Sequence, residues 1–259
     1  MQVIKGLLTL LFRCISCHSG FSPSEDLSSF PLCQTCLQRL GDCPVLCKNC
    51  GSPHCPSGYP SDCLRPWVHH SAIHSYSARY LLFESGYRVL RKWKTQRGSL
   101  WDQQILQAPT SLLSTWQSFS AEAIVPIPQP YSRAWTMRGS RAEILAKWVS
   151  YETRLPILPL LKSTEFTSLR KRQAELKLEE RLQNPFRFKT VYVPKPPKRV
   201  ILVDDFMTTG HTIRRAASHL LSLGVDKLHV FCLGVRPTQL HLQSHPHLVK
   251  SLRRTIPIG

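Results

Sequence analysis

The chain has 259 residues, with 34 Lys and Arg against 16 Asp and Glu, and a formal net charge of +18. This length allows a full α/β core and a small additional module. No apolar run is long enough to span a membrane, which excludes a protein anchored by transmembrane helices. The basic excess implies polyanionic partners such as nucleic acid, phosphorylated ligands or an anionic membrane surface.

The positive charge is concentrated in the second half of the chain. Residues 1–70 hold five Lys and Arg and four Asp and Glu, whereas residues 129–259 hold 23 and nine. The apolar stretch 3–12 is short and no small-residue cleavage site follows it. We therefore expect no signal peptide, and a cytoplasmic protein whose thiols are reduced.

Residues 1–66 are predicted to form a small cysteine-rich module. Two CxxC pairs lie in it with fifteen residues between them, which is a typical spacing for a four-thiolate zinc site. A segment so poor in aliphatic side chains needs a metal to hold it together. The predicted ligands of a first zinc ion are Cys14, Cys17, Cys33 and Cys36.

A third CxxC pair predicts a second zinc site in the same module. Its three predicted ligands are Cys47, Cys50 and Cys63. The partners of this pair are less clear from the sequence, and either His54 or Cys55 could fill the fourth position. Cys43 and Cys232 have no partner in the pattern and are expected to be free structural thiols.

Residues 67–122 are predicted to be a basic connector that contains an amphipathic helix. Phe83, Tyr87 and Leu90 recur at helical spacing. The other faces carry basic side chains: Arg88, Arg91, Lys92, Lys94 and Arg97. Such a helix can bind nucleic-acid phosphates, or it can pack its apolar face and leave its charges in solvent.

Residues 123–236 are predicted to form the α/β domain, followed by a C-terminal tail at 237–259. The apolar run 123–127 predicts the first strand of this core. Ser140 and Glu143 have the spacing of a capping box, which predicts that a helix begins there.

The segment VILVDDFMTTGHTI, residues 200–213, carries the strongest functional signal. Its apolar run predicts a strand buried on both faces, and the helical stripe that follows ends at Gly224. A second apolar run at 228–235 follows at the right distance to predict a parallel strand. Asp204 and Asp205 are then expected at the carboxyl end of the strand. Ligands bind at this edge in open parallel sheets.

The turn after these acids has the composition of an anion site. Backbone N–H groups at a helix N-terminus and hydroxyl side chains favour a phosphate. The turn consists of Thr208, Thr209, Gly210, His211 and Thr212. Two carboxylates would repel a bare phosphate, so we expect a ligand that also carries hydroxyl groups, such as a sugar 5′-phosphate, or a bridging metal.

This segment resembles the phosphoribosyl-pyrophosphate (PRPP) motif of type I phosphoribosyltransferases. From Cys14 to about Val235, the chain resembles the ComF family of competence-associated proteins, also called GntX-like. The resemblance rests on the cysteine pairs, on this motif, and on IVPIP at 124–128, RG at 138–139, Gln173, Leu176, Arg181 and Asn184. It implies an α/β fold with a type I phosphoribosyltransferase-like parallel sheet flanked by helices, preceded by the zinc module.

The resemblance also implies roles for individual residues. Asp204 and Asp205 would be the catalytic acids that hold the ribose hydroxyls, and the turn would cradle the 5′-phosphate. Arg133 and Arg138 would bind the pyrophosphate, and Mg²⁺ would accompany PRPP. The chain departs from the family at 140–142, where Ser-Arg-Ala stands in place of Phe-Asn-Gln.

Two functions are compatible with these expectations. The family favours a protein of DNA uptake and natural transformation that binds PRPP, single-stranded DNA and proteins of the competence machinery. The alternative is an active phosphoribosyltransferase of nucleotide salvage, which transfers 5-phosphoribose to a nitrogen acceptor. A weaker third reading is a PRPP-sensing regulator. The sequence indicates no acceptor base.

Overall fold

The computed structural model describes residues 14, 17–19, 32–33, 35–36, 40, 43, 45–53, 63, 68–82, 84–95, 102, 105–106, 110–129, 140–164 and 188–237. Within these ranges, none of the helices has the length and apolar character needed to cross a membrane.

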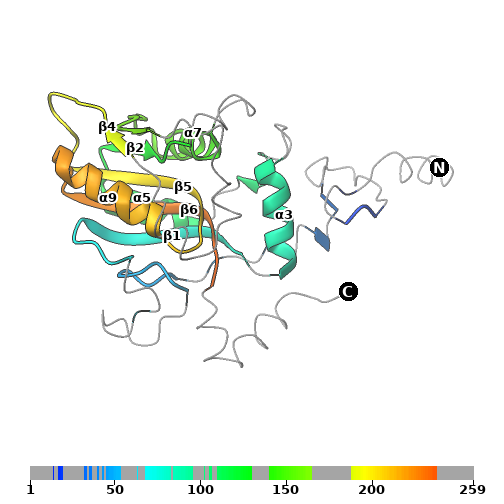
Figure 1. Ribbon diagram of the computed structural model, residues 1–259. Helices are drawn as coiled ribbons and strands as arrows, with labels where there is room; N and C mark the ends of the chain where they lie inside the picture. The colour runs from blue at the N-terminus through cyan, green and yellow to red at the C-terminus, as the bar shows by residue number, and fades with distance from the viewer. Residues whose placement is uncertain are drawn as a thin grey trace.

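The core is a four-stranded sheet in which every neighbouring pair is parallel (Figure 1). Its strands in spatial order are β1 (Ile73–Leu81), β6 (Lys227–Val235), β5 (Arg199–Met207) and β2 (Ala123–Pro126). The middles of the two central strands are buried on both faces. This burial explains their continuous apolar sequence and confirms the predicted parallel sheet.

Three helices cover the two faces of the sheet (Figure 1): α9 (His211–Leu223) on one side, α5 (Thr110–Phe119) and α7 (Arg141–Thr153) on the other. Successive side chains of β5 point to opposite faces. Leu202 therefore packs in one hydrophobic cluster with Leu220 of α9. Its neighbour Val203 packs in a second cluster with Leu145 of α7.

The connection β5–α9–β6 forms the predicted strand, turn, helix and strand. Gly210 opens α9 with φ of 80°, and Gly224 ends it with φ of 104°, donating its N–H to Leu220 and Leu221. Both glycines adopt the left-handed region that favours this residue. One detail differs from the prediction, because β5 continues through Asp204 and Asp205 to Met207. The acids thus belong to the strand and do not follow it.

The sheet also has a strand that the sequence did not indicate. The run 123–127 was expected to be the first strand of the core, but β1 precedes it in the chain and lies at the opposite edge of the sheet. The prediction was wrong because β1 has no apolar run. Its Ser75 and Ser77 hydrogen-bond to His229 of β6. The sheet therefore draws on residues of the predicted connector, and the domain boundaries at 66, 122 and 236 stay predictions.

The remaining elements lie around this core. A short antiparallel ribbon of β3 (Leu161–Ser163) and β4 (Phe188–Thr190) packs against α9. The predicted amphipathic helix is present as α3 (Glu84–Thr95). It buries Leu90 and Trp93 completely, while Arg88 and Arg91 are exposed. At the start of α7, the Ser140 N–H donates to Glu143 Oε2 at 3.3 Å, as one half of the predicted capping box requires.

Candidate functional site

The two acids of the motif lie side by side near the carboxyl end of β5. Asp205 is 6% exposed, and Asp204 is half-buried. The N–H of Asp205 donates to Asp204 Oδ1 at 2.8 Å, and the N–H of Phe206 donates to Asp205 Oδ1 at 2.6 Å. Each carboxylate is oriented by the backbone of the next residue. Both keep lone pairs that could accept hydrogen bonds from ligand hydroxyls.

The environment of Asp204 disfavours its charged form. Burial raises the pKa of Asp204 to about 7, and the neighbouring charge of Asp205 adds to the increase, while Lys94 and the Asp205 N–H oppose it. This carboxyl group therefore changes its charge near neutral pH. An acidic side chain with a strongly shifted pKa at the ligand edge of a parallel sheet is typical of a functional site.

The turn that follows leads directly into the N-terminus of α9. Thr208, Thr209, His211 and Thr212 are partly exposed, whereas Gly210 is buried. A Cβ at Gly210 would lie 2.6 Å from Val68 Cγ2, so this position has no room for a side chain. Burial, with Arg214 and Arg215, lowers the pKa of His211. The turn places backbone N–H groups and hydroxyls at one helix N-terminus, as an anion site requires.

Lys94 completes this part of the site, and the sequence did not indicate its place there. Its Nζ lies 2.5 Å from Asp205 Oδ2 and 5.1 Å from the centre of the Phe206 ring. The sequence pattern assigned Lys94 only to the amphipathic helix of the connector. The local sequence around Lys94 could not have predicted the contact, because it joins α3 to β5, which are far apart in the chain and meet only in the folded protein.

Several predicted site residues lie outside the described residues. These are the proposed pyrophosphate ligands Arg133 and Arg138, the family positions Gln173, Leu176, Arg181 and Asn184, and the proposed fourth zinc ligands His54 and Cys55. Their roles stay predictions.

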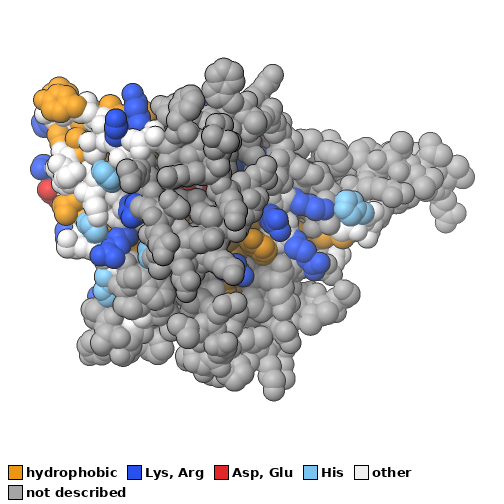
Figure 2. All heavy atoms as spheres, viewed as in Figure 1, with side chains coloured by type: hydrophobic (Ala, Val, Ile, Leu, Met, Phe, Trp, Pro, Cys, Tyr) orange, Lys and Arg blue, Asp and Glu red, His pale blue; other side chains and the backbone are white. Residues whose placement is uncertain are grey.

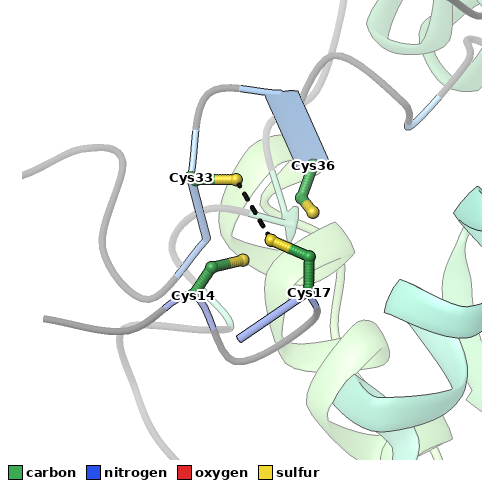
Figure 3. Close-up of side chains that lie close together, drawn as sticks. All are labelled: Cys14, Cys17, Cys33 and Cys36. Carbon is green, nitrogen blue, oxygen red and sulfur yellow. Dashed lines mark hydrogen bonds between the residues drawn. The ribbon is translucent and has the colours of Figure 1, made fainter. Parts of the chain in front are cut away.

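A second site lies in the cysteine-rich module. The ligand atoms of Cys14, Cys17, Cys33 and Cys36 all lie within 4.8 Å of one another, and Figure 3 shows their sulfur atoms turned toward a common centre. The sulfur atoms of Cys17 and Cys33 are 3.7 Å apart. A tetrahedral ion with Zn–S bonds of about 2.3 Å separates its sulfur ligands by about 3.8 Å. The four residues therefore fit a metal of this geometry.

The proton affinities of these thiols also favour a shared cation. Burial raises the pKa of Cys36, and hydrogen bonds with Cys17 and Cys14 raise it further. Burial acts in the same direction on Cys17, but hydrogen bonds with Ser19 and with the other thiols outweigh it and lower the pKa of Cys17 to about 6. One thiol can ionise readily while its neighbours resist a second negative charge. A bound cation removes that conflict.

A second cluster brings Cys47, Cys50 and Cys63 within 4.8 Å of one another. The sulfur atoms of Cys47 and Cys63 are 3.8 Å apart, again the distance expected across a tetrahedral metal. Three thiols are thus assembled as predicted.

The backbone of the second cluster repeats that of the first. In the first knuckle, Cys14 accepts from the His18 N–H and donates to Ser19. In the second, Cys47 accepts from the Gly51 N–H and donates to Ser52. The residue after each CxxC pair has positive φ, 61° at His18 and 64° at Gly51. Two segments with one hydrogen-bond pattern are expected to bind the same kind of ion.

The chain is similar to a described protein family over part of its length and to curated proteins over most of it. Residues 195–250 match the family described as phosphoribosyl transferase domain. Competence protein F of Haemophilus influenzae is 26% identical over 237 residues, covering 86% of this chain and 96% of that protein. The DNA utilization protein YhgH of Salmonella typhi is 25% identical over 243 residues, with coverage of 88% and 98%. The same protein of Escherichia coli O157:H7 is 23% identical over 238 residues.

One solved structure is also similar. The crystal structure of purine phosphoribosyltransferase from Pyrococcus horikoshii Ot3 superposes with a TM-score of 0.30 and 16% identity, over 64% of this chain and 80% of that chain. Such a loose superposition adds no argument.

The curated relatives confirm the resemblance to the ComF or GntX-like family. The fold is the predicted one, a phosphoribosyltransferase-like parallel sheet with flanking helices, preceded by a module whose cysteines could hold a metal.

Proposed function

We propose that this chain is a ComF-like protein that acts in DNA uptake and natural transformation by binding single-stranded DNA. Its phosphoribosyl transferase domain would bind PRPP or another 5-phosphoribosyl ligand. The observation that carries the ligand assignment is the placement of Asp204 and Asp205 near the carboxyl end of β5, where Phe206 and Met207 lead from them into the turn that opens α9.

The ligand follows from the two kinds of group in this site. The turn 208–212 offers donors to a phosphate, and the carboxylates accept hydrogen bonds from vicinal hydroxyls. A 5-phosphorylated ribose carries a phosphate for the turn at one end and vicinal hydroxyls for the carboxylates at the other. Arg133 and Arg138 are proposed to bind the pyrophosphate, and Mg²⁺ to enter with PRPP.

The DNA assignment is supported by charge and by the relatives. The chain carries +18 overall, and Figure 2 shows Lys and Arg side chains gathered over α3. On that helix, Arg88 and Arg91 are exposed and Lys92 is partly exposed. Relatives along nearly the whole chain are named for competence and for DNA utilization. Proteins of the competence machinery are proposed as further partners.

The same acids favour a second candidate, an active phosphoribosyltransferase. In that reading, a nitrogen nucleophile displaces pyrophosphate at C1 of the ribose, and the protein acts mainly by positioning and by charge stabilisation. The observation in its favour is Asp204, whose pKa is raised by burial to about 7 and which can therefore exchange a proton at neutral pH. Release of pyrophosphate in the presence of nitrogen bases would distinguish it from a binding protein.

The metal in the cysteine clusters is proposed to be zinc. Four thiolates at tetrahedral spacing are the ligands that structural zinc sites use, and the ion would supply folding stability to a segment with little apolar core. A cytoplasmic location is part of the proposal, because the clustered thiols must stay reduced to bind an ion.

Isothermal titration with PRPP and Mg²⁺, with and without single-stranded DNA, tests the proposal. We expect one molecule of PRPP to bind per chain and DNA to bind with a strong salt dependence. Absence of PRPP binding would overturn the ligand assignment. Absence of DNA binding at low ionic strength would overturn the DNA-uptake role and leave the transferase as the better candidate.

A further inference from the structure

The ion pair between Lys94 and Asp205 lies inside the candidate sugar-phosphate site. Lys94 comes from the last turn of α3 and is 31% exposed, while its partner carboxylate is only 9% exposed. Lys94 Nζ contacts Asp205 Oδ2 and also lies over the Phe206 ring. A lysine that reaches a buried acid at the ligand edge of a sheet differs from the solvated lysines of a basic helix.

The end of α3 that carries Lys94 is held in place by a second buried cation. Arg141, at the start of α7, is 5% exposed. Its Nε donates to the Lys94 backbone oxygen at 3.4 Å, and its guanidinium lies 4.7 Å from the centre of the Trp93 ring. Asp102 accepts from Arg141 at 3.4 Å and from Trp93 Nε1 at 2.8 Å. Lys94 is therefore presented to Asp205 by a fixed backbone.

The contact leaves the carboxylate able to bind a ligand. Asp205 Oδ1 accepts from the Phe206 N–H, and Oδ2 accepts from Lys94. A carboxylate oxygen can accept two hydrogen bonds, so with respect to the described residues each atom keeps one lone pair for a hydroxyl group. Lys94 does not need to leave the site when a sugar enters it.

Charge explains why a cation is needed at this place. Asp204 and Asp205 are adjacent, and any negative charge on them repels the phosphates of a phosphorylated sugar. An ammonium group in contact with Asp205 offsets one of the two negative charges in a region of low dielectric constant, where the effect is stronger than in water.

We propose that Lys94 is a positioning residue of the ribose-phosphate site, which holds the Asp205 carboxylate oriented so that it can accept a ribose hydroxyl. Arg141 supports it by fixing the end of α3. This inference rests on the proposed binding of a 5-phosphoribosyl ligand. It adds a functional group from the helix that is also the candidate DNA contact.

The test is the affinity for PRPP with Mg²⁺, measured by isothermal titration on the full chain. Lys94→Met keeps the length of the side chain and removes its charge. We expect its affinity to fall about tenfold or more, the effect of one charge-assisted hydrogen bond. Lys94→Arg should restore most of the loss. Lys147→Met, the same change at an exposed position of α7, should bind as the parent does.

A double-mutant cycle with Asp205→Asn identifies how Lys94 acts. If Lys94 acts through Asp205, Lys94→Met should have little further effect in the Asp205→Asn background. An undiminished further loss in that background would mean that Lys94 contacts the ligand itself, and the proposal would be wrong. Should Lys94→Met fail to fold in a thermal melt, Lys94→Gln replaces it in the same cycle.

The remaining outcomes separate this inference from the function on which it rests. A parent protein that does not bind PRPP overturns both. A parent that binds, with a Lys94→Met variant that binds equally well or more tightly, leaves the ligand assignment intact and overturns the role of Lys94.

Discussion

His229 is a titratable side chain with no access to solvent. It lies on β6, with Nδ1 2.8 Å from Ser75 Oγ and Nε2 2.7 Å from Ser77 Oγ of β1. It is 0% exposed, and burial, with a smaller contribution from His74, lowers its pKa to about 4. The neutral ring joins two strands by side-chain hydrogen bonds, so its protonation should affect the edge of the sheet.

The stability of the fold should therefore depend on pH through His229. The folded pKa of about 4 lies below the ordinary value of 6.5, so the unfolded state binds more protons between these values. The contribution of neutral His229 to the free energy of unfolding is therefore complete above pH 6.5. It is lost as the pH falls to about 4, and the total loss is about 3 kcal/mol. Chemical denaturation of the parent and of His229→Gln at several pH values would measure it as the difference between the two curves.

Two parallel curves between pH 4 and 6.5 would show that His229 does not carry this dependence. The difference between curves is the useful quantity because Asp204, whose pKa is raised, and the cysteine clusters also titrate or lose metal over part of this range.

The carboxylates of Asp204 and Asp205 carry the second prediction at this scale. Asp204→Asn with Asp205→Asn keeps the shape of both side chains and removes both charges. The affinity for PRPP should fall by about 1.5–3 kcal/mol for each charge-assisted hydrogen bond lost. Isothermal titration with PRPP and Mg²⁺ measures this loss. Unchanged affinity would show that the two carboxylates do not hold the ligand.

Helix α3 connects three features of the molecule. Its Lys92 Nζ lies 3.3 Å from His18 Nε2 of the first cysteine knuckle. Its Trp93 is buried in the cluster that includes Cys14 and Cys36, and its Lys94 reaches the acid pair. Figure 1 shows the helix between the sheet and the described residues of the first cysteine cluster. One element thus contacts both candidate sites and exposes basic side chains.

The basic face of α3 should contribute to binding of single-stranded DNA. The logarithm of affinity should fall linearly with the logarithm of salt concentration, with a slope of roughly −0.7 for each phosphate neutralised. If both side chains contact phosphates, Arg91→Ala with Lys92→Ala should make the slope shallower by about 1.4. Fluorescence anisotropy over a salt series would measure the slope.

A matched control removes the same charge elsewhere. Lys195→Ala with Lys227→Ala changes two exposed lysines of the α/β domain away from α3. The assignment of α3 fails if both double variants change the slope equally, because net charge alone would then explain the binding.

Across the whole molecule, residues that precede the sheet pack against the end of β5 and the turn that opens α9. A Cβ at Gly51 in the second knuckle would lie 2.7 Å from Met207 Cε, at the end of β5, and Val68 packs against Gly210. The end of β5 and the turn at Gly210 are therefore supported by residues that precede the sheet. Loss of metal should reach the sugar-phosphate site by this route.

The freshly purified, reduced protein should contain at least one zinc ion. Cys14→Ser with Cys17→Ser should lower both the zinc content and the melting temperature, because a structural zinc site supplies folding energy. Elemental analysis and thermal melts measure the two quantities. Asp204→Asn with Asp205→Asn is the control, since these residues are not cysteine-module ligands and their change should leave zinc content as it is. A protein without zinc, or a serine variant with unchanged zinc content, would contradict the prediction.

The sequence by itself determined those parts of the protein whose signals are local. Apolar runs identified β5 and β6, because a strand buried on both faces cannot alternate. Gly224 identified the end of α9, since few other residues adopt its positive φ readily. The CxxC spacing identified the cysteine clusters, because a knuckle is built from consecutive residues. The acids of the motif could be placed near the carboxyl end of β5 because they follow its apolar run directly in the sequence.

The tertiary structure alone decided the features that join distant segments. The strand β1 has no apolar run, and pairing with β6 and hydrogen bonds from His229 make it part of the sheet. In the sequence, Lys94 is one of several lysines and arginines of a basic helix. In the structure, the packing of Trp93 and Arg141 fixes the end of this helix so that Lys94 contacts Asp205. Such contacts depend on which surfaces meet when the core closes, and periodicity within one segment contains no information about its partner.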